Sequence, residues 1–505
     1  MKNKKNKIII ITILLSLIIM IILGMIVLTT KKVDKLSNVK IENQYGKEIT
    51  NYNENKMPFI IKKTDEKQKI YVDGKKMKDN ERIYKVGKHE IKVVNGLKKE
   101  KCEINIKQVK RENGHIYNIY VIQETLPTLL ASLNLSTNLN QKGFLWTART
   151  STVDLDKIKE SFPNIYISKY KGKIHPDVFK EELIPEIKEY IKTILEKDED
   201  AYFDLYIQED NFYLETELFG KIGLNDSRYN VNMYTNGTLG YTRKYEIKEE
   251  NKYERYLKEK KDYFNIIEKI KSNTWQGNDF PGSYMVEKNN KYYTISYNLD
   301  YMLISTLRKN ITLLMQYPEF HKFEDEQIAS EMEKANVKKI IAQDEFNKLD
   351  ENSKKLFFNI INLDKKDLDN KYFTEKDGKY LVITGTVPFY EKHKKEDFEK
   401  IVTKIAEDYG KEYILLYKPH PRAIPNKEQE EFLNKLNIKV LPGRLPMEAI
   451  TFVYPNLKLG GFGSSLYMSA DKGKTLFFIA KDKNELVEPL NELSESIFKN
   501  TKFYN

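Results

Sequence analysis

The sequence predicts an α/β protein in which two Rossmann-like domains face each other, preceded by a transmembrane helix and a small all-β domain. Three patterns in the 505 residues predict this fold class. Runs typical of buried strands alternate with helical spacing over residues 115–365 and again over residues 375–505. Short alternating runs separated by turn residues fill residues 36–107, and an uncharged apolar run fills residues 8–30.

The apolar run at residues 8–30 reads IIIITILLSLIIMIILGMIVLTT, which is long enough to cross a bilayer as one helix. No small-residue cleavage pattern and no lipid-accepting cysteine follows it, so we expect an uncleaved single-pass membrane anchor. Lysines stand on both sides of the run, so the positive-inside rule nearly cancels. The amino terminus and Asp34 favour a topology with the bulk of the chain outside the cell, and a cytoplasmic location is the alternative.

The segment from 36 to 107 contains the runs NVKIEN, PFIIKK, QKIYVDG, RIYKVGKHEIKVVNG and CEINIKQ. The pairs Asp73–Gly74 and Asn95–Gly96 punctuate these runs as hairpin turns. We therefore expect a small all-β module of immunoglobulin-like type.

Composition excludes several classes of partner and site. The net charge of +11 comes from 85 basic and 74 acidic residues spread along the chain, without a basic stripe interleaved with aromatic residues. We therefore expect no nucleic-acid partner. Cys102 is the single cysteine, which excludes an internal disulfide and a CxxC metal site.

The first α/β domain is predicted over residues 115–365. The strand-like runs NIYVIQ, NIYISKY, YFDLYIQ and YNVNMYTNG are separated by helical segments, one of which places Ile187, Ile191 and Ile194 on one face. Residues 250–365 show mostly helical spacing. Strands separated by helices imply a parallel sheet.

The second α/β domain is predicted over residues 375–505. Its strand-like runs are KYLVITGTV, EYILLY, IKVLP, KLGGFG and TLFFIA, and each repeat has about the size of a βαβ unit. Ligands of doubly wound sheets bind at the carboxyl ends of the strands, in the cleft. Three loops of this domain follow strands and therefore fall at that edge.

The first of these loops is KPHP. Pro419 and Pro421 each remove a backbone donor and fix a φ angle, so they end the strand and hold His420 in a stiff, extended setting. The second loop is LPMEA, where Glu448 stands in a predicted first helical turn and could accept hydrogen bonds from ribose hydroxyls.

The third loop is GGFGSS. Its glycines let the backbone approach a ligand closely, and Ser464 and Ser465 open the next helix, whose free N–H groups favour a phosphate. Taken alone, each of the three loops has an ordinary structural explanation: a packed histidine, a helix start and an N-cap. Together, at consecutive strand ends of one domain, they favour a binding site for a phosphorylated ligand.

The order KPHP, PxE and a glycine-rich loop ending in SS resembles the bacterial sialyltransferases and polysialyltransferases, a group of two-domain GT-B glycosyltransferases whose signature includes an HP motif and a Ser-Ser/Thr motif. NIYVIQETLPTLLASLNL resembles the opening strand and helix of these enzymes, and NMYTNGTLGY resembles the segment that carries their D/E-D/E-G motif. The resemblance covers residues 115–490.

The resemblance implies a role for each matching residue. His420 would contact the phosphate of a CMP-sugar donor and assist departure of the nucleotide, Glu448 would hold the nucleoside, and the serines would hold the phosphate. It also implies an inverting transfer to a glycan acceptor without a metal cofactor. The residues expected to bind the donor are Lys418, Pro421, Glu448, Gly463, Ser464 and Ser465.

The chain departs from this pattern at the position of the catalytic base. Where the family has two acidic residues before a glycine, this chain has Thr235, Asn236 and Gly237. Asparagine accepts no proton at working pH, so Asn236 cannot act as the general base that the family places there. The acidic residues that could substitute are Glu209, Asp210 and Asp226.

Three functions are therefore compatible with the sequence. The first is a glycosyltransferase anchored in the bacterial cell membrane by residues 8–30, which transfers a sugar to a cell-surface glycan. The second is a catalytically degraded relative that binds glycans or nucleotides at the cell surface, as Asn236 suggests. The third, a teichoic-acid-type glycerophosphotransferase, is disfavoured because LGGFGSSLYMSA carries neither an acidic residue nor a histidine.

Overall fold

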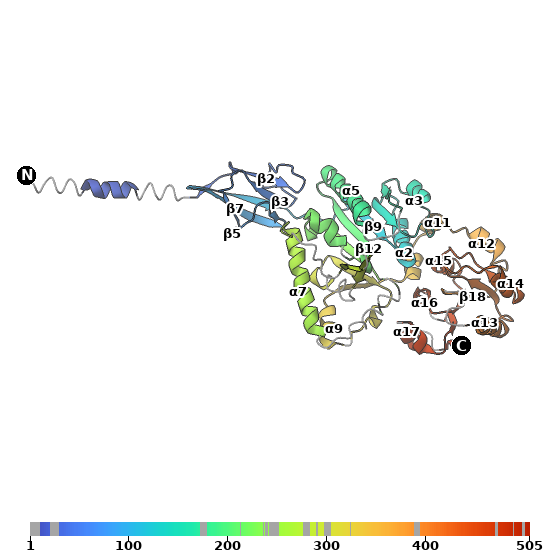
Figure 1. The fold of residues 1–505 in the computed structure, drawn as a ribbon. Coiled ribbons are helices and arrows are strands. Elements are labelled where there is room, and N and C mark those ends of the chain that lie inside the picture. Colours follow the sequence, from blue (N-terminus) through green and yellow to red (C-terminus); the bar gives the residue numbers. More distant parts are fainter. Residues whose placement is uncertain are drawn as a thin grey trace, which may run out of the picture.

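A computed structural model shows the chain as an amino-terminal helix, an all-β module and two α/β domains, in that order (Figure 1). The structure describes residues 11–20, 30–171, 179–212, 214–235, 237, 241, 252–275, 283–288, 291–296, 305–323, 325–387, 394–469, 473–487, 489–496 and 500–505.

The predicted membrane anchor is described only in part. Residues 11–20 are helical and their apolar side chains are exposed, whereas residues 8–10 and 21–29 lie outside the described residues. Within the described ranges, no helix combines the length and the apolar character that crossing a bilayer requires. The anchor therefore stays a prediction.

The all-β module consists of two sheets around one core. One sheet has the strand order β1-β8-β7-β4-β5 and the other the order β2-β3-β6. The strands are β1 (Lys31–Lys32), β2 (Val39–Asn43), β3 (Phe59–Lys63), β4 (Lys69–Val72), β5 (Lys75–Lys76), β6 (Arg82–Ile83), β7 (Gly87–Asn95) and β8 (Lys98–Ile106).

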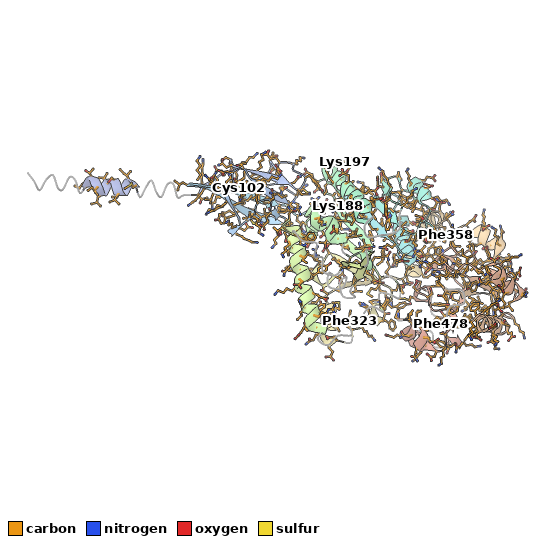
Figure 2. The ribbon with its side chains drawn as sticks, viewed as in Figure 1. Cys102, Lys188, Lys197, Phe323, Phe358 and Phe478 are labelled. Atoms are coloured by element: carbon orange, nitrogen blue, oxygen red, sulfur yellow. The ribbon has the colours of Figure 1, made fainter. Side chains whose placement is uncertain are left out.

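Both predicted hairpin turns of the module are present. Val72 pairs with Lys75 across a two-residue loop in which Asp73 and Gly74 have φ of 50° and 79°, the backbone that an Asp-Gly turn favours. Asn95 pairs with Lys98, so the second two-residue loop is Gly96–Leu97, one residue later than the predicted pair Asn95–Gly96, with φ of 59° at Gly96. Cys102 lies in the core between the sheets (Figure 2), and burial raises the pKa of its thiol to about 12. The module is all-β as predicted, and its immunoglobulin-like character stays a prediction.

The first α/β domain is built on a seven-stranded parallel sheet with the order β11-β10-β9-β12-β13-β16-β17. The central strands are buried almost throughout, as expected for a parallel sheet covered on both faces. The strands are β9 (Ile116–Ile122), β10 (Lys142–Thr147), β11 (Ile165–Ile167), β12 (Tyr202–Gln208), β13 (Tyr229–Tyr234), β16 (Ile311–Met315) and β17 (Asn336–Lys339).

Helices of the first domain cover this sheet and continue toward the second domain. They include α2 (Thr125–Ser136), α3 (Leu155–Ser161), α5 (Ile184–Lys197), α7 (Lys252–Lys271), α9 (Glu326–Met332), α10 (Ala342–Asn347), α11 (Glu351–Ile360) and α12 (Lys365–Lys371). The region from 250 to 365 is less helical than predicted, because it also contains β16, β17 and the hairpin of β14 (Ser283–Lys288) and β15 (Lys291–Ser296).

The second α/β domain has a six-stranded parallel sheet with the order β20-β19-β18-β21-β22-β23. The chain starts in the middle at β18, runs outward to β20 and then returns to β21, which places a topological switch point between β18 and β21. The strands are β18 (Tyr380–Thr384), β19 (Ile414–Lys418), β20 (Lys439–Val440), β21 (Lys458–Gly461), β22 (Thr475–Ile479) and β23 (Lys502–Tyr504); the helices are α13 (Lys395–Tyr409), α14 (Lys427–Lys435), α15 (Met447–Val453), α16 (Leu466–Ser469) and α17 (Leu490–Ser496).

The all-β module is fixed to the first domain by two buried arginines. Arg82 of the module donates hydrogen bonds to the carbonyl oxygens of Gly220, Lys221 and Lys271. Arg228 of the domain donates in the other direction, to the carbonyl oxygen of Lys56. Arg228 directly precedes β13, so the module sits near the amino-terminal edge of the first sheet. The described contacts of the module therefore lie at the edge opposite the carboxyl ends of the strands.

Candidate active site

The carboxyl-terminal edges of the two sheets meet. Gly237, which follows β13, lies so close to Ser465, which follows β21, that a Cβ built on the glycine would stand 2.8 Å from the serine Cβ. Gln316, which follows β16, donates a hydrogen bond of 2.6 Å to the hydroxyl oxygen of Ser469. The two domains therefore face each other across the edge at which doubly wound sheets bind ligands.

His420 stands at this edge in a fixed orientation. β19 ends at Lys418, and the N–H of Ala423 donates to the His420 carbonyl oxygen at 2.9 Å, which closes a tight turn. The N–H of Arg422 donates to Nδ1 of His420 at 3.1 Å. Because Nδ1 is an acceptor, the neutral imidazole carries its proton on Nε2, which makes Nε2 a hydrogen-bond donor for a ligand.

The surroundings of His420 favour its neutral form. Partial burial lowers the pKa of its imidazole, and the cations Arg422, Lys418 and Arg149 lower this pKa further. Arg149 follows β10 in the first domain. The electric field at His420 is thus set by groups from both sides of the cleft.

Lys418 stabilises the loop that carries His420. Its side chain is buried, and its Nζ donates to the carbonyl oxygens of Pro419 at 3.0 Å and Gly443 at 2.9 Å. Burial lowers the pKa of Lys418 to about 8, although the nearby Glu448 carboxylate raises it. The ammonium group ties the end of β19 to the loop before α15. Its predicted contact with a donor stays a prediction.

Glu448 occupies the first turn of α15, as the sequence predicts. Burial raises the pKa of its carboxyl group above the usual value, and its own backbone N–H and Lys418 act in the opposite direction. A buried carboxyl next to a buried ammonium at a ligand-binding edge is an arrangement typical of functional sites.

The GGFGSS loop passes very close to β18. Gly461 has φ of +129°, and a Cβ there would lie 2.3 Å from the carbonyl oxygen of Thr384, so only glycine fits. Gly463 is exposed, and a Cβ there would make ordinary contacts of 3.5 and 3.7 Å with Leu486 and Leu490. The close approach predicted for this loop therefore depends on Gly461.

The two serines of the loop have different surroundings. Ser464 caps the start of α16, because its hydroxyl oxygen accepts the N–H of Leu466 at 3.3 Å. α16 is short in the described chain, from Leu466 to Ser469. Ser465 is half-buried and faces Gly237 of the first domain. Pro421, the remaining predicted donor contact, is exposed beside His420.

The structure describes only the neighbours of Asn236, the residue that the family resemblance aligns with a catalytic base. Asn236 lies outside the described residues, whereas Thr235 before it is buried and Gly237 after it contacts Ser465. Glu209 follows Gln208, which pairs with Tyr234, so the parallel register places Glu209 beside Thr235.

The three acidic residues that could replace the base differ in position. Glu209 is fully buried in this structure, with 0% exposure. The side chain of Asp210 lies outside the described part of the chain. Asp226 precedes β13 at the opposite edge of the sheet, where it accepts hydrogen bonds from Lys271 and Tyr229. The possibility that Asp226 supplies the base is therefore wrong.

The structure adds first-domain residues that sequence analysis missed. The Gln208 side-chain oxygen accepts the N–H groups of Gln123, at 2.5 Å, and Glu124, at 2.7 Å, at the switch point between β9 and β12. Arg149 pairs with Glu124. The signal for these residues was a polar side chain at the end of a buried strand or within two residues after it, which is the same kind of signal that identified the loops of the second domain.

No protein-family model matches this chain, and no curated protein matches it. Solved structures do match. The α/β-galactoside α-2,3-sialyltransferase of Photobacterium phosphoreum is 16% identical, with a TM-score of 0.54 over 77% of this chain and 99% of that one. A 2,6-sialyltransferase of a Vibrionaceae Photobacterium species, solved with CMP and lactose, is 15% identical, with a TM-score of 0.52 over 93% of this chain and 90% of that one.

A third structure, the GT-B domain of the Photobacterium damselae sialyltransferase, is 17% identical, with a TM-score of 0.51 over 77% of this chain and 99% of that one. The 2,6-sialyltransferase extends the similarity beyond the part that the GT-B domain matches. These similarities show that the chain shares the two-domain α/β fold of bacterial sialyltransferases, which is described as GT-B in the third structure.

Proposed function

We propose that this chain is a glycosyltransferase that moves a sugar from a CMP-sugar donor to a glycan acceptor. The observation that carries the proposal is the meeting of the two strand edges, where Gly237 of the first domain contacts Ser465 of the second. His420 and Glu448 stand on neighbouring strand ends of the second domain. The similar fold of sialyltransferases, one of which was solved with CMP and lactose, supports the same chemistry.

In this mechanism His420 acts on the leaving nucleotide. Its Nε2–H donates to the donor phosphate, and the phosphate charge raises the low pKa of the free imidazole, so the histidine can protonate or stabilise CMP as it leaves. A positioned acid of this kind contributes about a 10²- to 10⁴-fold rate increase. Ser464 and Ser465 hold the phosphate, and Glu448 holds the nucleoside.

We expect the transfer to be inverting and to need no metal. A nucleoside monophosphate carries less negative charge as a leaving group than a nucleoside diphosphate, so we expect hydroxyl and imidazole donors with the nearby Arg149 to stabilise it. The acceptor hydroxyl approaches from the first domain, where Asn236 occupies the position of the base.

The experiment measures CMP release from a CMP-sugar by the full-length protein, with and without a glycan acceptor. His420→Ala should abolish release, and His115→Ala is the matched control, because His115 is a partly exposed histidine directly before β9, at the far edge of the first sheet. Absence of CMP binding by a folded sample in calorimetry would exclude both the transferase and any nucleotide-binding function.

The second candidate is a catalytically degraded relative that binds a nucleotide or glycan without transfer. It is favoured by Asn236, which stands in the sequence where the resembling family has its base, and by the complete burial of Glu209 beside Thr235. CMP binding without CMP release, in both the presence and the absence of acceptor, would identify this candidate.

We further propose that residues 8–30 anchor the protein in the bacterial cell membrane, with the all-β module and both α/β domains outside. Cytosolic nucleotide sugars would reach a cytoplasmic domain more easily, so topology bears directly on activity. Protease added to intact cells should digest the bulk of the chain. Full protection would place the domains in the cytoplasm.

A further inference from the structure

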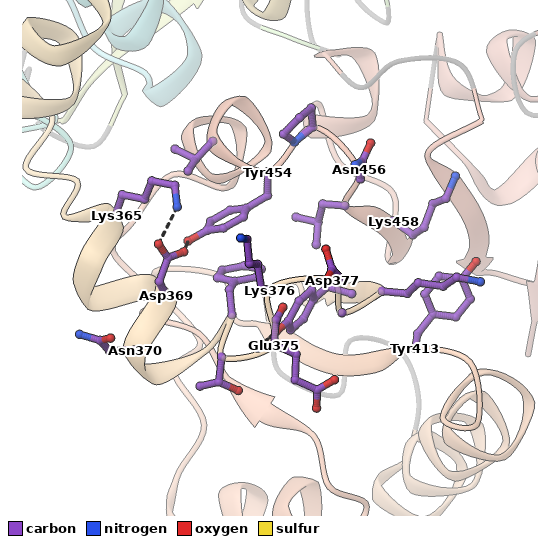
Figure 3. Close-up of a pocket in the computed structure, with 18 residues that line it drawn as sticks. Lys365, Asp369, Asn370, Glu375, Lys376, Asp377, Tyr413, Tyr454, Asn456 and Lys458 are labelled. Atoms are coloured by element: carbon purple, nitrogen blue, oxygen red, sulfur yellow. Dashed lines mark hydrogen bonds and ion pairs between the residues drawn. The ribbon is translucent and has the colours of Figure 1, made fainter.

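A cavity opens at the edge of the second sheet where strands β18, β19 and β21 begin. Figure 3 shows the residues that line it. The cavity encloses about 810 Å³, within the range of about 300–1,000 Å³ that is typical of ligand pockets. Its walls come from residues 365–380 before and at the start of β18, from Tyr413 just before β19, and from residues 453–458 up to the start of β21. Because all these strands run away from the cavity toward His420, it is not part of the donor cleft.

Aromatic rings form a fixed wall of this cavity. Tyr454 stacks on Phe373, with ring centroids 3.7 Å apart and planes inclined by 19°. The Tyr454 hydroxyl donates to Asp369 at 2.7 Å, which fixes the ring further. Tyr413, half-buried, contributes a second ring (Figure 3). Flat rings of this kind present an apolar surface to a ligand.

The charges around the cavity nearly cancel. Four lysines line the cavity. Lys365 forms an ion pair with Asp369 at 2.5 Å and Lys379 forms one with Glu412 at 3.1 Å, whereas Lys458 donates a hydrogen bond of 2.9 Å to the carbonyl oxygen of Gly473. The fourth lysine, Lys376, lies between Glu375 and Asp377 in the sequence, and both acidic residues also line the cavity. A strongly anionic ligand, such as a nucleotide, meets only a small excess of positive charge here, because three carboxylates line the cavity beside the four lysines.

We propose that this cavity binds an uncharged oligosaccharide. The C–H face of a sugar ring can stack on Tyr413, since the Tyr454 ring is already stacked on Phe373 and has the Lys365 ammonium 5.4 Å from its centroid. The sugar hydroxyls find donors and acceptors in Lys376, Asp377 and Asn456, which are exposed around the same space (Figure 3). The choice of a sugar rests on the size of the cavity, its aromatic wall and its nearly balanced charges, and not on the proposed function. Only its identity as a distal part of the acceptor glycan rests on the proposed function.

The test measures binding of lactose, maltotriose and chitotriose to the full-length protein by saturation-transfer NMR. The variant Lys376→Ala/Asn456→Ala removes two ligand-facing side chains with exposed positions, so we expect it to fold normally. The matched control is Asn434→Ala/Lys435→Ala on α14, which changes the same residue types at exposed positions outside the cavity.

We expect at least one sugar to bind the wild type and the α14 control equally, and to bind the cavity variant about ten-fold or more weakly, since two hydrogen-bonding partners are lost. His420→Ala should leave this binding unchanged. Binding of none of the sugars, binding that survives Lys376→Ala/Asn456→Ala, or binding lost in His420→Ala would overturn the proposal. CMP release, measured on the same samples, decides the proposed function separately.

Discussion

Replacement of Gly237 by alanine tests whether the two strand edges work as one site. Gly237 has φ of +56°, where an alanine backbone costs roughly 1–2 kcal/mol. The new Cβ would lie 2.8 Å from Cβ and 3.3 Å from Oγ of Ser465. Carbon atoms in contact sit about 3.5–4.0 Å apart, so the two loops must separate by about 1 Å.

That separation acts on the loop expected to hold the donor phosphate. A misplacement of about 1 Å in a positioned group can lower a rate by about 100-fold. We therefore expect Gly237→Ala to lower CMP-sugar turnover by about 100-fold, while the free energy of unfolding falls by only about 1–2 kcal/mol. Turnover is followed by CMP release and stability by urea unfolding.

Gly96→Ala is the matched control. Gly96 has φ of +59° in the β7–β8 hairpin, and a Cβ there meets no atom within 4 Å. It reproduces the backbone strain without the collision, so we expect a similar loss of stability and full turnover. Normal turnover by Gly237→Ala, or an equal loss of turnover in both variants, would refute the reasoning.

Three further predictions concern side chains that are buried or partly buried. A bound phosphate should raise the low pKa of His420, so CMP should bind with proton uptake and more tightly at about pH 6 than at about pH 8. Calorimetry in buffers of different ionisation enthalpy measures this proton uptake, which His420→Ala should reduce. Arg308→Met leaves the buried Glu215 carboxylate without its ion-pair partner and should cost about 3–5 kcal/mol in denaturant unfolding, most of it recovered when Glu215→Leu is added; a loss below about 1 kcal/mol would contradict this. Arg82→Met should speed hydrogen exchange in β6, whereas Lys98→Met at an exposed turn should not.

Much of the fold was predictable because local patterns agree with the global arrangement. The turn pair Asp73–Gly74 has the positive φ angles of a tight hairpin. Ile187 and Ile191 are buried on one face of α5, as their spacing predicts. Strands such as YFDLYIQ are buried on both faces, which only a parallel sheet between helices explains.

Two strands of the first sheet were not predictable from their composition. β16, with the sequence ITLLM, is a short apolar run that periodicity cannot distinguish from part of a buried helix. β17, with the sequence NVKK, is an exposed edge strand without an apolar face. Such a strand is defined by its neighbour, since its backbone pairs with β16.

The candidate site was also predictable from the sequence only in part. His420, Glu448 and Ser465 follow strands of one domain, so chain order alone predicts that they share an edge. The contact of Gly237 with Ser465 and the effect of Arg149 on His420 depend on how the two domains sit against each other. No local pattern encodes that placement, because the residues involved are far apart in the sequence.

The two domains also differ in how completely they supply the groups that the proposed reaction needs. The donor half of the proposed reaction needs a neutral His420, the phosphate-binding serines and Glu448, all in the second domain. The acceptor half needs a group that removes a proton from the acceptor hydroxyl. Glu209 lies beside Thr235 and carries a carboxyl group, but this side chain is fully buried. A carboxyl group with no exposed surface is out of contact with an acceptor hydroxyl in this conformation. Cleavage of the donor with water as acceptor therefore tests the donor half by itself, and the ratio of transfer to this hydrolysis measures how far the chain compensates for Asn236.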